Sequence, residues 1–365
     1  MMSQNVQGSG REALEKFLRE VGGGDWSVHG PQQSSAPVPT TRELGERFGI
    51  SNTTAFRVVR ELLDEGVLCR RDNGRYYPAS ARELIRSHYP IAFPTRRFES
   101  WTSMLRDIMI GVTRGCGDLR NGILLVHDER LVEQPSVEEV AKLADESVQQ
   151  EILGRFVERG DLLSGIIFDE IWNDEVLGGF AKHFDRPVVI YRETQLDSFG
   201  NVAADFETGA LLALTHLQSR GYDRIALASP LQDYLPNRRF LECCSIQASR
   251  QGYPLLSDGI YEFRSSDKGF RSLQRDLKKA EGRVAIICPE DNGALWLKQN
   301  LEGKYALGDE LGILSAMGTS VARENRISSI TYDFVEIGER AVRMIIQSEL
   351  RHETVAPQLY FGKTT

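Results

Sequence analysis

The sequence has no long hydrophobic run, few cysteines and no cluster of metal ligands. No stretch of the 365 residues approaches the roughly 18–20 apolar residues that a membrane span needs. The N-terminal residues contain no apolar core of the kind found in secretory signals, so we expect no leader and no membrane anchor. The five cysteines, at positions 69, 116, 243, 244 and 288, are odd in number and lack metal-ligand spacing. This usage favours a reducing cytoplasm and predicts no metal site.

The chain also lacks the common catalytic signatures. It contains no GxGxxG after a strand, no P-loop GxxxxGKS/T, no HExxH and no GxSxG. The six histidines are scattered, and His216 lies within a helical pattern, which favours a structural role over a catalytic one. We therefore expect no catalytic residue and no cofactor. An α/β enzyme stays open as an alternative, because the fold predicted below does not exclude one.

Residues 38–78 show the pattern of two short helices followed by a hairpin. Thr40 and Glu43 have capping-box spacing, and Gly49 is placed to end the first helix. Ser51 can cap a second helix, in which apolar residues recur at positions 55, 58, 59, 62 and 63. Strands at 67–70 and 75–77 flank a DNG turn. Helix, sharp turn, helix and hairpin together predict a winged helix-turn-helix.

The polar residues of this segment suit DNA binding. A recognition helix in the major groove presents small polar groups at its N-terminus, where they reach phosphates and base edges. The predicted DNA-binding residues are Arg42, Ser51, Asn52, Thr53, Thr54, Arg57 and Arg75, with Arg60 further along the second helix. The alternative is a small helical subdomain whose arginines are merely solvated.

The same segment resembles a known family. The motifs VPTTREL, FGISNTT, ELLDEGVL and RRDNGR follow in the order and nearly the spacing of GntR-type winged helix-turn-helix domains. The resemblance runs from residue 38 to about residue 77. It implies contacts to DNA backbone or bases from Arg42, Thr53, Thr54 and Arg57.

The segment departs from the family pattern at three positions. Asn52 stands where a basic residue is usual, Phe56 where arginine is frequent, and Tyr76 in place of the second wing glycine. The family's base preference is therefore not carried over. Residues 1–80 hold ten Arg and Lys and ten Asp and Glu, so the net charge of −8 belongs to the rest of the chain. DNA binding by such a segment would depend on oriented arginines and dimerisation rather than on bulk attraction.

From residue 91 onward, short apolar runs alternate with amphipathic helical stretches. Strands are predicted at 91–93, 122–126, 164–168, 186–191, 201–204, 224–228, 283–288, 311–314 and 327–331. Helices are predicted between most of them, including 101–114, 146–159, 207–220, 237–251, 268–280 and 335–348. This alternation is typical of parallel sheets covered on both faces. The number of strands favours an α/β fold with two doubly wound lobes over a single sheet.

The expected organisation is a winged-helix domain, a linker and a two-lobed domain. We place the DNA-binding domain at 1–80, the linker at 81–90 and the effector domain at 91–365. A helix is predicted at 11–21, and the GntR-type resemblance implies that it packs behind the DNA-binding elements. The N-lobe would comprise about 91–203 and 332–350, and the C-lobe about 204–331 and 351–365. The lobes would then be joined by crossings near Ala203, Thr331 and Arg351.

A second resemblance covers residues 187–350. The motifs GALLALTHLQSRGYDRIALAS, VAIICPEDNGALWL and ISSITYDFVEIGERAVRMI resemble the effector domain of LacI/GalR-type repressors, which is related to periplasmic sugar-binding proteins. A GntR-like DNA-binding domain joined to such a body resembles the arabinose-repressor type of hybrid regulator. The resemblance implies a carbohydrate or sugar derivative as effector, bound in a cleft between the lobes.

Ligand residues in such folds lie just after the carboxyl ends of the strands. The candidates at these positions are Phe98, Trp101, Asp169, Arg192, Arg238, Arg239, Glu290, Asp291, Tyr332 and Phe334. By the resemblance, either Arg238 or Arg239 matches a sugar-clamping arginine. Arg192 stands where an aspartate is common, and the segment after residue 314 lacks the acids usual in the family. These departures favour an anionic effector such as a sugar acid or sugar phosphate.

The combined prediction is a cytoplasmic DNA-binding transcriptional regulator that responds to a small metabolite. Repression is favoured over activation by the resemblance. The expected partners are double-stranded operator DNA, the effector and a second copy of the chain, since two half-sites add specificity. The alternative from another class is a small-molecule-binding protein of periplasmic type without a DNA function.

Overall fold

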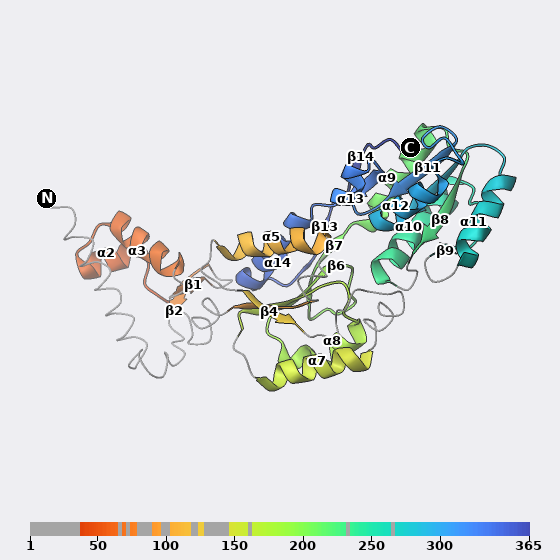
Figure 1. Ribbon diagram of the computed structural model, residues 1–365. Coiled ribbons are helices and arrows are strands. Elements are labelled where there is room, and N and C mark those ends of the chain that lie inside the picture. The colour runs from red at the N-terminus through yellow and green to blue at the C-terminus, as the bar shows by residue number, and fades with distance from the viewer. Residues whose placement is uncertain are drawn as a thin grey trace. The chain divides into compact units, whose positions relative to one another are not determined.

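The computed structural model describes residues 37–64, 68–70, 74–78, 90–95, 103–117, 123–127, 146–159, 163–230, 234–263 and 267–365. The chain divides into two compact units. The first comprises residues 1–90, 119–122 and 162–164, and the second comprises residues 91–118, 123–161 and 165–365 (Figure 1). The predicted helix at 11–21 and most of the predicted linker lie outside the described residues.

Two helices joined by a tight turn begin the described part of the first unit. Helix α2 spans Thr41–Phe48 and α3 spans Asn52–Asp64. The predicted capping box is present, because the Glu43 amide donates to the Thr40 hydroxyl at 3.3 Å and the Thr40 amide donates to the Glu43 carboxylate at 2.7 Å. Gly49 ends α2 with φ +64°, the left-handed conformation that glycine tolerates best. The local sequence therefore sets both ends of the first helix.

A two-stranded antiparallel sheet follows the helices. Strand β1 spans Leu68–Arg70 and β2 spans Tyr76–Pro78, so Arg75 precedes the returning strand rather than starting it. The Val38 amide donates to the Tyr76 carbonyl at 2.7 Å, which ties the start of the described chain to the hairpin. The core of this unit is a single apolar cluster of Val38, Leu44, Ala55, Val58, Val59, Leu62 and Leu68.

The first lobe of the second unit is a fully parallel sheet with the strand order β13-β7-β6-β5-β3-β4. Its strands are β3 (Ile91–Thr95), β4 (Ile123–His127), β5 (Gly165–Phe168), β6 (Pro187–Tyr191), β7 (Gly200–Ala204) and β13 (His352–Val355). Its helices are α5 (Ser103–Gly117), α7 (Glu146–Arg159), α8 (Asp174–Phe180), the short 3-10 helix η3 (Ala181–His183) and α14 (Phe334–Gln347). Helices α5 and α14 cover one face of the sheet, and α7 and α8 cover the other (Figure 1).

Helices α5 and α14 approach each other closely through two glycines. A Cβ atom at Gly111 would lie 2.0 Å from the Val335 carbonyl oxygen, and one at Gly338 would lie 2.2 Å from the Ile108 carbonyl oxygen. Neither position can therefore carry a side chain without separating the helices.

The second lobe is a mostly parallel sheet with the strand order β14-β12-β11-β10-β8-β9. Its strands are β8 (Arg224–Ser229), β9 (Tyr261–Glu262), β10 (Val284–Cys288), β11 (Leu311–Ser315), β12 (Ser328–Thr331) and β14 (Gln358–Tyr360), of which β14 runs antiparallel to β12. Its helices are α9 (Phe206–Ser219), α10 (Leu235–Gln251), α11 (Asp267–Lys279), α12 (Asp291–Leu301) and α13 (Ser320–Glu324). Strands β10 and β11 are buried along their whole length, as expected when helices cover both faces of a parallel sheet.

One predicted lobe boundary requires correction. Strand β13 pairs in parallel with β7, with His352 opposite Asn201 and Val355 opposite Ala204. Residues 352–355 thus belong to the first sheet, although we expected residues 351–365 to lie in the C-lobe. The third crossing between the lobes falls between Val355 and Gln358 instead of near Arg351. The physical reason is that β13 completes the edge of the first sheet and buries Val355 there.

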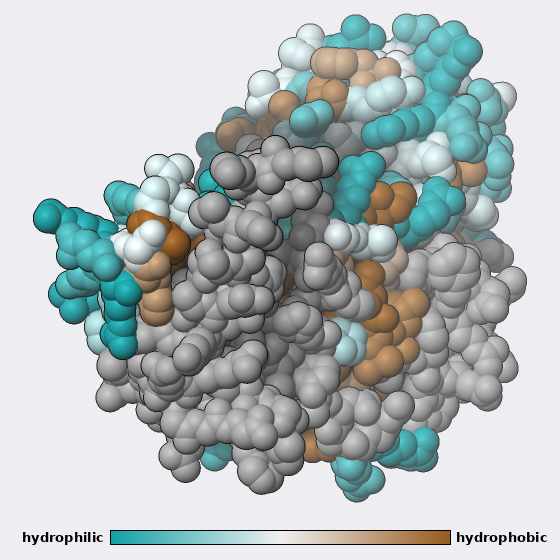
Figure 2. Space-filling view, turned by 90° about the vertical axis from the view of Figure 1, so that its left-hand side faces the viewer, coloured by the Kyte–Doolittle hydropathy of each residue, from teal (hydrophilic) through white to brown (hydrophobic). Residues whose placement is uncertain are grey.

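None of the helices formed by the described residues is long and apolar enough to cross a membrane. On the face shown in Figure 2, the described residues include both hydrophilic side chains and separate groups of apolar side chains. Cys116, Cys243, Cys244 and Cys288 are free thiols and are buried.

Candidate functional site

The first candidate surface is the exposed face of α3. The two sides of this helix differ in exposure. On one side, Ala55, Val58, Val59 and Leu62 are buried in the core. The opposite stripe consists of exposed side chains, namely Asn52, Thr53, Phe56, Arg57 and Arg60. We call these five residues the α3 stripe. Spacings of one, three and four residues place them on one side of the helix.

Ser51 and Thr54 form the N-terminal cap of α3. The Thr54 amide donates to the Ser51 hydroxyl at 3.1 Å, and the two hydroxyl oxygens lie 2.8 Å apart. This pairing engages both side chains. Asn52 and Thr53, next to them on the chain, are exposed at the start of the helix.

The arginines of this unit are exposed and only weakly paired. Arg42 lies 3.2 Å from Glu46, and Arg57 lies 3.9 Å from Glu61, both one helical turn along their own helix. Exposed pairs of this kind contribute about 0.3–0.5 kcal/mol, so a phosphate can replace the carboxylate at little cost. Arg75 is exposed beside the hairpin, and its charge contributes to a lowered pKa of Glu43, whose main cause is the hydrogen bonds from Thr40.

The second candidate site lies where the carboxyl ends of the two parallel sheets face each other. Asp169 and Glu170 follow β5, Tyr191 ends β6, and Glu290 follows β10. Two polar side-chain contacts between described residues connect the lobes here. The Tyr234 hydroxyl donates to Glu170 at 2.6 Å, and Arg239 pairs with Glu193 at 3.1 Å.

Tyr191 lies among carboxylates from both lobes. Burial raises the pKa of Tyr191 far above its usual range, and the charges of Glu170, Asp291 and Glu290 raise it further. Its backbone has φ +70°, a conformation that is rare for a non-glycine residue and often marks a functional position. Sequence reasoning missed this residue because it is the last residue of an apolar strand run.

Asn237 is a further residue that its position in the sequence does not single out. It lies in the first turn of α10, is 2% exposed, and donates from Nδ2 to a Glu290 carboxylate oxygen at 2.5 Å. We expected Arg238 or Arg239 as the ligand contact on this helix, and both arginines are paired with carboxylates. Arg238 is half exposed and lies 3.9 Å from Glu242 on its own helix. Arg239 pairs with Glu193 and, at 3.6 Å, with Glu207.

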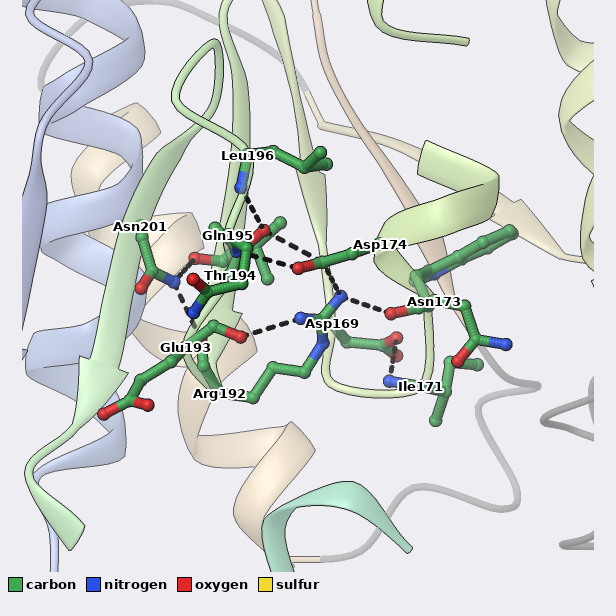
Figure 3. A network of polar contacts seen from close by, with 12 residues as sticks. Asp169, Ile171, Asn173, Asp174, Arg192, Glu193, Thr194, Gln195, Leu196 and Asn201 are labelled. Atoms are coloured by element: carbon green, nitrogen blue, oxygen red, sulfur yellow. Dashed lines mark hydrogen bonds and ion pairs between the residues drawn. The ribbon is translucent and has the colours of Figure 1, made fainter. Parts of the chain in front are cut away.

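Arg192 is held in an internal network rather than presented to a ligand (Figure 3). Its guanidinium lies 2.7 Å from Asp174, donates to the Glu193 carbonyl at 2.7 Å, and also donates to the Trp172 carbonyl. Asp174 in turn accepts from the Thr194 hydroxyl at 2.9 Å. The side chain is 7% exposed, so its charge is already used to join the α8 start to the loop after β6. Arg192 therefore gives no reason to expect an anionic effector.

Asp291 has an internal role that the sequence did not indicate. Its carboxylate accepts from the Ser315 hydroxyl at 2.5 Å, from the Thr319 amide and hydroxyl at 2.6 Å each, and from the Ser329 hydroxyl at 3.3 Å. It is 2% exposed. These bonds connect the start of α12 to the last residue of β11, to Ser329 near the start of β12 and to the N-cap of α13, so Asp291 is placed as a structural acceptor.

Tyr332 and Phe334 belong to an aromatic cluster at the crossing between the lobes. Phe206 packs edge-on against Tyr191 at 5.7 Å and against Tyr332 at 5.8 Å, and Tyr191 packs against Phe334 at 5.6 Å. The buried Tyr332 hydroxyl has no hydrogen-bond partner among the described residues, and burial raises its pKa. Asp169 is fully buried, with the Ile171 amide 3.4 Å from its carboxylate. Phe98 and Trp101 lie outside the described residues.

The structure brings together a set of residues that we call the inter-lobe cluster, namely Glu170, Tyr191, Tyr234, Asn237 and Glu290. Its chemistry is that of hydrogen-bond acceptors and aromatic rings. The described residues contain no group of three or more His, Cys, Asp or Glu side chains arranged to hold a metal ion. A charged surface pocket lined by Arg114, Asp333, Glu336, Glu339, Arg340 and Arg343 lies elsewhere, on α5 and α14.

Solved structures resemble this chain in fold, at low sequence identity. The sequence matches no known family model and no curated relative. Among solved structures, a LacI-family transcriptional regulator from Enterococcus faecium with bound ribose has 14% identity and a TM-score of 0.58, covering 75% of this chain and 98% of its own. The lac repressor dimer bound to operator and an anti-inducer has 16% identity and a TM-score of 0.59, covering 76% and 94%. The trehalose repressor from Escherichia coli has 14% identity and a TM-score of 0.55, covering 75% and 100%.

These likenesses establish the fold of the second unit. It is the two-lobed α/β fold, with two mainly parallel sheets, that LacI-family effector domains share with periplasmic binding proteins. The similar structures are transcriptional regulators and not enzymes.

Proposed function

We propose that the chain is a transcriptional repressor that binds an operator through its first unit and a small carbohydrate through its second. The observation that supports this proposal is that two features occur in the same chain. One is the exposed, arginine-bearing α3 stripe, behind a capped helix-turn-helix and hairpin. The other is a fold found in transcriptional regulators whose structures contain operator DNA or ribose.

The resemblance of residues 38–77 to GntR-type winged helices supports the DNA-binding half. In this proposal α3 enters the major groove, Asn52 and Thr53 reach base edges, and Arg42, Arg57 and Arg75 contact phosphates. Ser51 and Thr54 keep the N-terminus of α3 intact and can also donate to a phosphate.

The inter-lobe cluster supports a neutral polyhydroxylated ligand. Carboxylates accept strong hydrogen bonds from sugar hydroxyls, and aromatic rings cover the C–H faces of a sugar. Glu170, Tyr191, Asn237 and Glu290 are the residues we propose as ligand contacts. A sugar acid or phosphate would instead meet carboxylates, because Arg192 and Arg239 are already paired with Asp174 and Glu193.

We further propose that the protein acts as a homodimer on a palindromic operator. One winged helix reads a short half-site, and two symmetric copies double the specific contacts. A stable monomer in sedimentation equilibrium, with and without DNA, would count against this part of the proposal.

The experiment that tests the function uses the full chain and a library of random DNA duplexes. Repeated selection should enrich one sequence family with two inverted half-sites. Thermal unfolding of the same protein is then followed in the presence of neutral sugars, sugar acids and sugar phosphates, because a ligand that binds only the native state raises the midpoint. We expect enrichment of an operator and stabilisation by a neutral sugar. Stabilisation without any operator would favour a binding protein without a DNA function.

A further inference from the structure

Phe56 is an exposed aromatic residue in the middle of the α3 stripe. It is 56% exposed, and it is the one exposed large hydrophobic residue among the described residues of the first unit. In contrast, Phe48 of the preceding helix packs against the core of the unit. Single exposed apolar residues are common, so exposure alone does not indicate a role. The surroundings of Phe56 make its position informative.

Every other residue of the α3 stripe is polar or positively charged. Asn52 lies one turn before Phe56 and Arg60 one turn after it, while Thr53 and Arg57 flank it. None of these neighbours offers an apolar side chain at the spacing where helix residues meet. Among the described residues Phe56 makes no ring–ring or cation–π contact. The ring therefore lies outside the apolar core of this unit, and phenylalanine has a lower helix propensity than arginine or glutamine.

The chemistry of the ring limits what it can recognise on DNA. Phenylalanine has no hydrogen-bonding atom, so it cannot read the donors and acceptors of guanine, cytosine or adenine. Thymine alone presents an apolar group in the major groove, its 5-methyl group. Phe56 lies in the N-terminal half of the helix and is followed by two exposed arginines. If the helix lies in the major groove, an apolar side chain at this position fits this methyl group.

We propose that Phe56 reads the 5-methyl group of a thymine in the major groove and so specifies a T·A pair in each half-site. This inference rests on the function proposed above, in which α3 is the recognition helix. It adds a specificity-determining residue, because Arg57 and Arg60 would hold the backbone while Phe56 selects the base. A change at Phe56 should therefore alter which sequences are bound more than how strongly DNA in general is bound.

The test replaces one methyl group at a time. Each thymine of the selected operator is changed to deoxyuridine, which keeps the base pair and removes only the methyl group. Binding of the full chain is measured by fluorescence anisotropy. We expect one thymine in each half-site at which the wild-type protein loses about fourfold in affinity, the factor for burying one methyl-sized group. Phe56→Ala should show no loss at that thymine, and Phe56→Leu should keep part of it.

Two further measurements distinguish methyl recognition from a change in base pairing or in the fold. Changing the critical T·A pair to C·G should weaken wild-type binding, and 5-methylcytosine at that position should restore part of it. Phe361→Ala removes a ring that is 71% exposed in the second unit, and it should retain the wild-type sensitivity to deoxyuridine. Phe56→Ala should also leave the sedimentation mass and the thermal midpoint unchanged.

The outcomes separate this inference from the proposed function. If the wild-type protein binds its operator but no thymine shows a methyl effect, the role of Phe56 is refuted and the repressor function stands. The same holds if Phe56→Ala keeps the full sensitivity to deoxyuridine, or if it halves the sedimentation mass and so marks a contact between copies. If selection enriches no operator, both the proposed function and the role of Phe56 fail.

Discussion

Replacing Asp291 by asparagine tests whether this residue supports the second lobe or binds the ligand. The sequence predicted a ligand contact, whereas the structure shows four hydrogen bonds from Ser315, Thr319 and Ser329. Hydrogen bonds to a charged group contribute roughly 1.5–3 kcal/mol each, and neutral ones roughly 0.5–1.5 kcal/mol. The change keeps the size of the side chain but removes its charge.

The expected magnitude follows from the geometry of these bonds. The Thr319 amide can only donate, so the single acceptor oxygen of asparagine must face it, and the new NH2 group faces the two serines. The serine hydroxyls can rotate and accept, which limits the loss to the weakening of each bond by about 1 kcal/mol. Because the bonds share one carboxylate, the losses are not additive. We expect the free energy of unfolding to fall by about 3 kcal/mol and the thermal midpoint to fall by about 6–12 °C.

The assay is thermal and urea unfolding of the full chain, with Glu290→Gln as the matched control. Glu290 is the preceding residue and accepts from Asn237 at 2.5 Å, a bond that glutamine can also accept. Glu290→Gln should therefore cost about 1 kcal/mol or less, and it should weaken binding of the sugar that stabilises the wild type. The structural role of Asp291 is refuted if Asp291→Asn unfolds like the wild type while abolishing sugar binding.

Three other predictions follow from the described contacts. Arg57→Ala should weaken binding to all duplexes alike and reduce the slope of log affinity against log salt concentration by about 1. A salt titration measures this slope, and an unchanged slope would show that Arg57 does not contact a phosphate. Gly209→Ala places a Cβ atom 2.3 Å from the buried Tyr332 hydroxyl. Thermal unfolding should therefore show a loss of about 1–3 kcal/mol in the free energy of unfolding. A variant as stable as the wild type would show that the crossing between the lobes is loosely packed. Burial lowers the pKa of His216, with a smaller contribution from Arg220, so the unfolded chain binds the proton first as the pH falls. The wild type should therefore lose stability as the pH falls below about 6.5, the usual pKa of histidine, and His216→Gln should lose less between about pH 7 and pH 5. Identical slopes of unfolding free energy against pH for the two proteins would contradict this.

The sequence predicted those elements whose stabilising interactions join residues close together in the chain. The Thr40–Glu43 capping box, the left-handed Gly49 and the Ser51 cap all depend on residues within a few positions of one another, and each is present. All nine predicted strands of the second unit are also present, because buried parallel strands read as continuous apolar runs. Strands β9, β13 and β14 were missed because they are short, and the polar HETV of β13 pairs at the edge of a sheet.

The candidate site was less predictable because it depends on pairings between distant residues. Nothing near Arg192 in the sequence shows that Asp174 and the Trp172 carbonyl hold it. Likewise, the acceptor role of Asp291 depends on Ser315 and Ser329, which only the order of strands in the sheet brings together. Charged residues at the strand ends therefore indicated where the inter-lobe cluster lies. They did not show which of these charges are available to a ligand.

The proposed function requires that one chain couples an operator to a sugar. The most direct measurement is the anisotropy of a labelled operator bound to the full chain, titrated with the neutral sugar that raises the thermal midpoint. A ligand shifts the DNA-binding equilibrium only by its difference in affinity between the two states, and coupling of about 1–3 kcal/mol is typical. We predict that saturating sugar weakens operator binding by about 5- to 150-fold, and that Glu290→Gln binds the operator but responds less. Operator affinity that stays constant from zero to saturating sugar would contradict the proposed coupling.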